Sequence, residues 1–147
     1  MEKFLDVNVK KQLTEVFTNL EHTVVLLFFS GEENCDYCRD TRELLSEITT
    51  ISEKIELREF ERRTDDELVK KYHVDKTPTI IVTRKNEEEL IDFGIRFAGI
   101  PAGHEFSAFI NAILSVSTDQ SHLSIQTKEF LAGLKQPIHL QVFTTPT

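Results

Sequence analysis

The sequence lacks tryptophan, has only two cysteines among its 147 residues, and contains no long hydrophobic run. Its longest apolar stretch, residues 24–29, is far too short to cross a bilayer. The N-terminal residues show no apolar stretch of the length typical of a signal peptide. We therefore expect a cytoplasmic protein with no membrane partner.

The sequence also lacks any cluster of lysine and arginine, and its formal net charge is −8 at pH 7. Nucleic acids and anionic membranes attract basic surfaces, so nucleic acid is not an expected partner either. The length is that of one domain with room for part of a second. Eleven phenylalanines indicate an ordinary apolar core.

The two cysteines that are present, Cys35 and Cys38, lie three positions apart directly after the apolar run. Positions i and i+3 share one face of a helix, so the two sulfurs can approach to bonding distance. Asn34 is a candidate N-cap, which would place Cys35 in the first helical turn, where the helix dipole stabilises a thiolate. In the cytoplasm such a pair is typical of redox chemistry. Cys35 is the expected attacking thiolate and Cys38 the resolving thiol.

Half of a zinc site and an inert pair are the alternatives for these two cysteines. Zinc requires four ligands, however, and the sequence has no second cysteine pair. Its five histidines are scattered without ligand-like spacing. We expect no metal and no cofactor other than the redox-active disulfide itself.

Hydrophobic periodicity predicts five helices and five strands. The expected helices span residues 6–20, 35–51, 64–72, 104–116 and 127–134, and the expected strands span residues 23–30, 54–60, 77–83, 90–97 and 138–144. Thr64 and Glu67 have the spacing of a capping box that would open the third helix. Strands 77–83 and 90–97 form an antiparallel hairpin after two parallel strands. The prediction is an α/β fold with a central mixed sheet and helices on both faces.

This order of elements, with Cys35-Asp36-Tyr37-Cys38 after the first strand and Thr77-Pro78 about 40 residues later, resembles the thioredoxin/glutaredoxin superfamily over residues 1–116. The segment 93–106 resembles a narrower group, the tandem-domain protein disulfide oxidoreductases, or glutaredoxin-like proteins, of thermophilic archaea and bacteria. Members of that group carry two thioredoxin units. The resemblance implies a thioredoxin-like domain over 1–116, a linker over 117–126, and over 127–147 the truncated start of a second unit, which ends just before its Cys-X-X-Cys.

The resemblance also implies a substrate-binding surface around the cysteines. Thr77-Pro78 is similar to the superfamily's cis-proline loop, whose backbone pairs with an extended substrate peptide. Ala98 and Gly99 would form the other wall, and Tyr37 stands at a glutaredoxin-like position between the cysteines. One departure from thioredoxin is that the first strand contains no ionisable residue. Proton transfer during resolution must therefore use water or another group.

The leading interpretation is a thiol–disulfide oxidoreductase that exchanges disulfides with protein substrates and is reduced by an upstream, thioredoxin-reductase-like flavoprotein. One alternative is an electron-relay module of a peroxidase-reductase system, because alkyl hydroperoxide reductase flavoproteins also begin with two tandem thioredoxin folds. Another is a redox-weak scaffold unit that presents substrate to a second, active unit. Apolar residues in 138–143 would be costly to leave in solvent, so we also expect a homodimer through residues 127–147.

Overall fold

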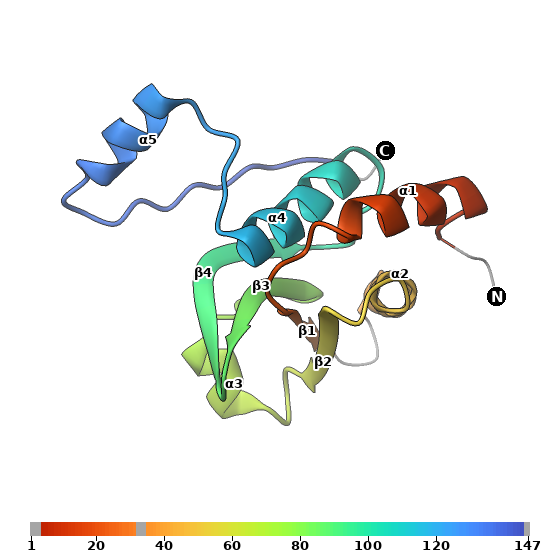
Figure 1. Cartoon of the computed structure of the whole chain (residues 1–147). Helices are drawn as coiled ribbons and strands as arrows, with labels where there is room; N and C mark the ends of the chain where they lie inside the picture. The colour runs from red at the N-terminus through yellow and green to blue at the C-terminus, as the bar shows by residue number, and fades with distance from the viewer. Residues whose placement is uncertain (1–3, 32–34, 146–147) are drawn as a thin grey trace.

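The computed structural model describes residues 4–31 and 35–145, which fold into a sheet flanked by helices (Figure 1). Its helices are α1 (Val7–Phe17), α2 (Cys38–Thr49), α3 (Asp66–Lys71), the 3-10 turn η1 (Gly103–Glu105), α4 (Phe106–Thr118) and α5 (Ile125–Ala132). Its strands are β1 (Val24–Ser30), β2 (Ile55–Glu61), β3 (Thr79–Asn86) and β4 (Glu89–Ala98).

The sheet has the strand order β2-β1-β3-β4. Strands β1 and β2 are parallel, whereas β3 is antiparallel to both β1 and β4. In the centre of this register, Leu26 of β1 pairs with Leu57 of β2 and Val82 of β3. All seven residues of β1 are buried, because a central strand covered on both faces has no side chain in solvent. The predicted mixed sheet is confirmed.

Alternate residues of β1 enter two separate apolar clusters, one on each face of the sheet. Val24, Leu26 and Phe28 pack with residues of α1, α2 and α4, which together cover one face. Val25, Leu27 and Phe29 pack with Tyr72 and Val74 and with the partly buried Leu68 and Val69 of α3 on the other face. Helices therefore lie on both faces, as predicted.

The capping box predicted at Thr64 and Glu67 is wrong. The helix begins at Asp66, and the Thr64 hydroxyl donates instead to the Glu61 carbonyl at 3.3 Å. The Asp65 carboxylate turns back to accept the Glu61 N–H at 2.9 Å. Both side chains therefore stabilise the turn after β2 in place of the helix start.

Helix α4 continues to Thr118, past the predicted end at residue 116, because Val116 and Ser117 are both buried. The Ser117 hydroxyl donates to the His22 carbonyl at 2.6 Å. This contact anchors the end of α4 to the loop before β1. None of the helices in the described ranges is long and apolar enough to span a bilayer.

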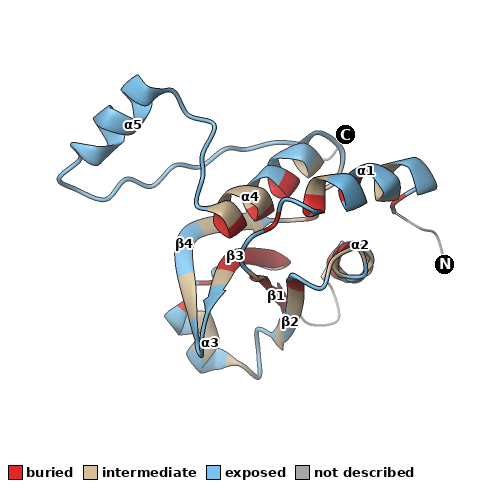
Figure 2. Cartoon of the chain, in the orientation of Figure 1, coloured by how far each residue is buried: buried red, intermediate tan, exposed pale blue. Residues whose placement is uncertain are grey.

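The strand predicted at residues 138–144 is wrong. Residues 138–144 form neither helix nor strand, and no described strand pairs with them. An isolated strand is not stable without a partner, which explains the difference. Helix α5 and the segment after it are exposed throughout (Figure 2), with Leu140 at 86% and Phe143 at 89% of full exposure. The Thr144 hydroxyl donates a hydrogen bond to the Glu105 carboxylate, next to α4.

Candidate active site

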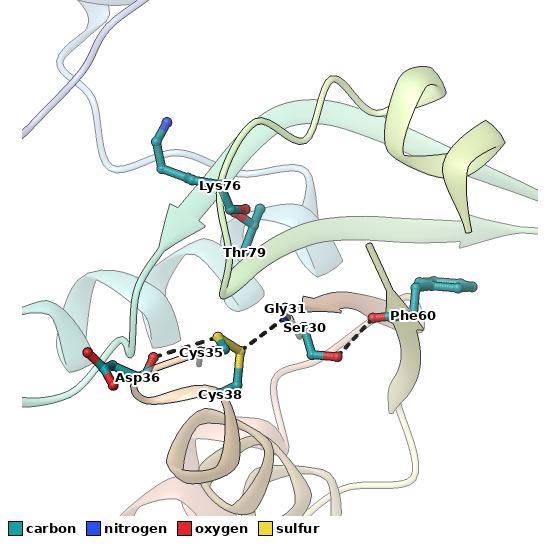
Figure 3. Close-up of a disulfide and its surroundings, with 8 residues drawn as sticks. All are labelled: Ser30, Gly31, Cys35, Asp36, Cys38, Phe60, Lys76 and Thr79. Carbon is teal, nitrogen blue, oxygen red and sulfur yellow. Dashed lines mark hydrogen bonds between the residues drawn. A yellow bond between two sulfur atoms is a disulfide. The ribbon is translucent and has the colours of Figure 1, made fainter. Parts of the chain in front are cut away.

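Cys35 and Cys38 are joined by a disulfide at the end of β1, with their Cα atoms 5.5 Å apart (Figure 3). The Gly31 N–H donates to the Cys38 sulfur at 3.3 Å, and the Cys35 sulfur lies 3.7 Å from the Asp36 carbonyl oxygen. Cys38 is 7% exposed, whereas Cys35 is only half-buried. The sulfurs do reach bonding distance, and Cys35 is the more accessible of the two.

The chain between the cysteines is a turn and not the start of a helix. Helix α2 begins at Cys38, whose N–H donates to the Cys35 carbonyl at 3.3 Å. Tyr37 has a φ of 66°, and this left-handed conformation delays helical hydrogen bonding until Cys38. The prediction of Cys35 in the first helical turn is therefore wrong, and the N-cap predicted at Asn34 lies outside the described residues. Cys38 is the residue at the helix N-terminus, where unpaired backbone amides favour a thiolate.

The loop before β3 meets the disulfide across Gly31. The Thr77–Pro78 peptide bond is cis, and Pro78 is buried. A Cβ atom added to Gly31 would lie 3.2 Å from the Cys35 Cβ and 3.3 Å from the Thr77 Cβ, and closer still to the Thr77 hydroxyl. A side chain at this position would require Thr77 and Cys35 to shift. Gly31 was not among the site residues predicted from the sequence, although a glycine directly after a buried strand could have indicated a close approach of the backbone.

The end of β4 forms the next part of the same surface. The Gly99 N–H donates to the Pro78 carbonyl at 2.8 Å, and Ala98 pairs with Thr79. Gly99 has a φ of 102°, which side chains strongly disfavour. The structure thus places the predicted wall residues beside the predicted cis-proline loop.

Tyr37 is 54% exposed on the turn between the cysteines, and Asp36 beside it is exposed as well. In the loop before Thr77, a hydrogen bond from Lys76 holds the pKa of Asp75 below its ordinary value. Asp75 is therefore ionised at neutral pH. In the described ranges, no three His, Cys, Asp or Glu side chains are grouped so that they could hold a metal ion.

The chain is similar in sequence to two kinds of bacterial protein. It is 35% identical to a Bacillus subtilis NADH dehydrogenase over 113 residues, which cover 77% of this chain and 19% of that protein. It is 31% identical to the alkyl hydroperoxide reductase F protein of Staphylococcus epidermidis over 143 residues, covering 97% of this chain and 25% of that protein. No protein-family model matches the chain.

Among solved structures, a protein disulfide oxidoreductase from Aeropyrum pernix matches with a TM-score of 0.76 and 25% sequence identity. The match covers 90% of this chain and 58% of the archaeal one. The chain has the thioredoxin fold. This thioredoxin-fold chain spans only about a fifth to a quarter of the length of the curated relatives described above.

Proposed function

We propose that this chain is a thiol–disulfide oxidoreductase unit that exchanges disulfides with protein substrates. The observation that carries the proposal is the bond between its only two cysteines, at the end of the central strand and beside the Thr77–Pro78 loop. Cys35 is partly exposed, whereas Cys38 is buried, so Cys35 is the residue that a substrate would meet first. The thioredoxin fold shared with a protein disulfide oxidoreductase supports the same chemistry.

The reaction is a two-step exchange that conserves electrons. The reduced Cys35 thiolate attacks a substrate disulfide, which forms a mixed disulfide and releases one substrate thiolate. Cys38 then attacks the Cys35 sulfur, closes the Cys35–Cys38 disulfide and releases the second substrate thiolate. Two electrons pass from the chain to the substrate, and each released thiolate takes a proton. The accessible edge formed by Thr77, Ala98 and Gly99 would hold the substrate backbone, with Pro78 beneath it and Tyr37 at its rim.

Insulin reduction with dithiothreitol as the electron source tests this proposal. The full chain should reduce insulin faster than dithiothreitol alone, and Cys35→Ser should fall to the dithiothreitol rate, because the one thiol that remains, Cys38, is buried. Cys38→Ser should accumulate a mixed disulfide with insulin, visible on a non-reducing gel, because the resolving thiol is gone. A wild-type rate equal to that of dithiothreitol would favour the scaffold alternative, and turnover by Cys35→Ser would refute the assigned roles.

The electron donor in this proposal is an upstream, thioredoxin-reductase-like flavoprotein. Similarity to an alkyl hydroperoxide reductase protein, over 97% of this chain, supports a place in a reductase-coupled system. Similarity to the same protein also supports the second candidate function, an electron-relay module of a peroxidase-reductase system. The two candidates differ only in the acceptor, since a relay module would deliver its electrons to one dedicated protein disulfide.

A second copy of the chain is the further partner we propose, bound through residues 127–147. Leu140 and Val142 are 86% and 84% exposed, and burying a side chain of this size is worth about 1.5–3 kcal/mol. We expect light scattering after size exclusion to give twice the 17.0 kDa chain mass, and the double variant Leu140→Asp/Val142→Asp to give a monomer. Gln141→Asp adds a charge between these two positions without removing an apolar side chain, so it is the matched control and should remain dimeric. A monomeric wild type would refute this partner.

A further inference from the structure

The buried polar side chains of the described residues fall into two groups. Four are hydroxyls that donate to a backbone carbonyl: Ser30 to Phe60, Thr79 to Lys76, Thr83 to Val25 and Ser117 to His22. The fifth is Thr41 of α2, which is completely buried and whose Oγ1 has no hydrogen-bond partner among the described residues. An unpaired buried hydroxyl is unfavourable, and a valine of the same shape would avoid it. A second state in which this hydroxyl is paired would account for its presence.

Thr41 lies one helical turn after Cys38. Both side chains belong to the buried stripe of α2, together with Leu45 and Ile48. Residues three apart on a helix have Cβ atoms about 5–6 Å from each other. Threonine in a helix divides between two χ1 rotamers, so its hydroxyl can change direction without a backbone shift. This spacing places the Thr41 hydroxyl on the helix face that carries Cys38.

The redox state of Cys38 determines how strong a hydrogen-bond acceptor its sulfur is. In the disulfide the sulfur is neutral and already takes the Gly31 N–H at 3.3 Å. After reduction a Cys38 thiolate is a far stronger acceptor, because a charged partner makes a hydrogen bond shorter and stronger. Strand β1 has no ionisable side chain that could serve Cys38 instead.

We propose that Thr41 is a positioning residue for the resolving step, donating its hydroxyl hydrogen bond to the Cys38 thiolate. The inference rests on the proposed function for its place in the reaction, but the hydrogen bond itself needs no substrate. Cys38 first gives its proton to water, and Thr41 stabilises the thiolate that remains. The thiolate attacks the Cys35 sulfur, the Cys35–Cys38 bond forms, and the bond from Cys35 to the substrate sulfur breaks. The substrate leaves with the electron pair and takes a proton from water.

The first experiment measures the pKa of Cys38 by thiolate absorbance in the Cys35→Ser chain, where Cys38 is the only thiol. Adding Thr41→Val should raise that pKa by about one unit, which is a tenfold smaller thiolate fraction at neutral pH. Thr41→Ser keeps the hydroxyl and should keep the pKa. Thr50→Val removes an exposed hydroxyl at the far end of α2, where it donates to the Glu47 carbonyl, and is the matched control.

The second experiment follows resolution of a mixed disulfide between Cys35 and a thionitrobenzoate probe in the otherwise native chain. Thr41→Val should slow the release of the probe about threefold at pH 7, because a higher thiol pKa lowers the thiolate fraction tenfold but raises its nucleophilicity about threefold. Thr41→Ser should restore the rate. An unchanged Cys38 pKa in Thr41→Val would overturn the inference. So would a Cys38 pKa in Thr41→Ser that is raised as much as in Thr41→Val. A shifted pKa in a chain that fails to reduce insulin would refute the proposed function and leave this inference standing.

Discussion

Replacing Gly31 with alanine is expected to slow disulfide exchange by about ten- to a hundredfold. The added Cβ would meet the Cys35 Cβ at 3.2 Å and the Thr77 Cβ at 3.3 Å, so the disulfide and the loop before β3 must move apart. Overpacking of this kind costs about 1–3 kcal/mol, and we expect the free energy of unfolding to fall by that amount. Insulin reduction and urea unfolding measure the two effects on the same sample.

The chain offers a matched control for this change. A Cβ added to Gly133, after α5, meets its nearest atom at 3.5 Å, which is an ordinary contact. Gly133→Ala should therefore leave both the exchange rate and the unfolding midpoint as they are. Adding Thr77→Ala to Gly31→Ala removes the hydroxyl that the new methyl meets most closely and should recover part of the stability. If Gly31→Ala left the exchange rate and the unfolding midpoint unchanged, as Gly133→Ala should, the close packing of Thr77 and Cys35 around Gly31 would be refuted.

Replacing Phe29 with alanine is expected to lower the free energy of unfolding by about 3–5 kcal/mol. Phe29 is completely buried on the face covered by α3, where its ring lies 5.2 Å from the Phe60 ring and 6.3 Å from the Tyr72 ring, centroid to centroid. Few other buried side chains share this cluster, so the remaining ones cannot close the cavity. The midpoint of urea unfolding should fall while its slope stays unchanged.

Phe93→Ala is the control for this second change. Phe93 is 42% exposed on β4 and contacts the Arg84 guanidinium, which lies 5.1 Å from its ring centroid. An exposed cation–π contact is worth about 0.5–1 kcal/mol, so this variant should lose no more than that. Equal losses in Phe29→Ala and Phe93→Ala would show that the α3 face carries little of the stability.

The elements with strong local patterns were predictable from the sequence. The unbroken apolar run of β1 correctly indicates a strand buried on both faces, because every second residue must face one of two covered layers. Helix α5 lies near its predicted place but begins two residues earlier, directly after Ser124, whose hydroxyl accepts the Thr127 N–H at 3.1 Å. The strand prediction for residues 138–144 was wrong because a strand also needs a partner strand. The apolar residues of this segment resemble a strand, but pairing is not a local property.

The chemistry of the candidate site follows from the order of residues without any knowledge of distant contacts. Two cysteines three residues apart, with no others in the chain, can bond only to each other within one molecule. A buried strand immediately before them fixes where the pair stands. Both facts are local, so the sequence suffices for them.

The way that pair is held depends instead on long-range packing. Thr77 and Cys35 both lie close to Gly31 because β3 is the neighbour of β1 in the sheet, although the two residues are far apart in the sequence. The left-handed conformation of Tyr37 moves the start of the helix from the predicted Cys35 to Cys38. The pattern of apolar residues does not predict this conformation. The unpaired hydroxyl of Thr41 appears only once packing has removed water from it, because an unpaired buried group is defined by its surroundings and not by its residue type.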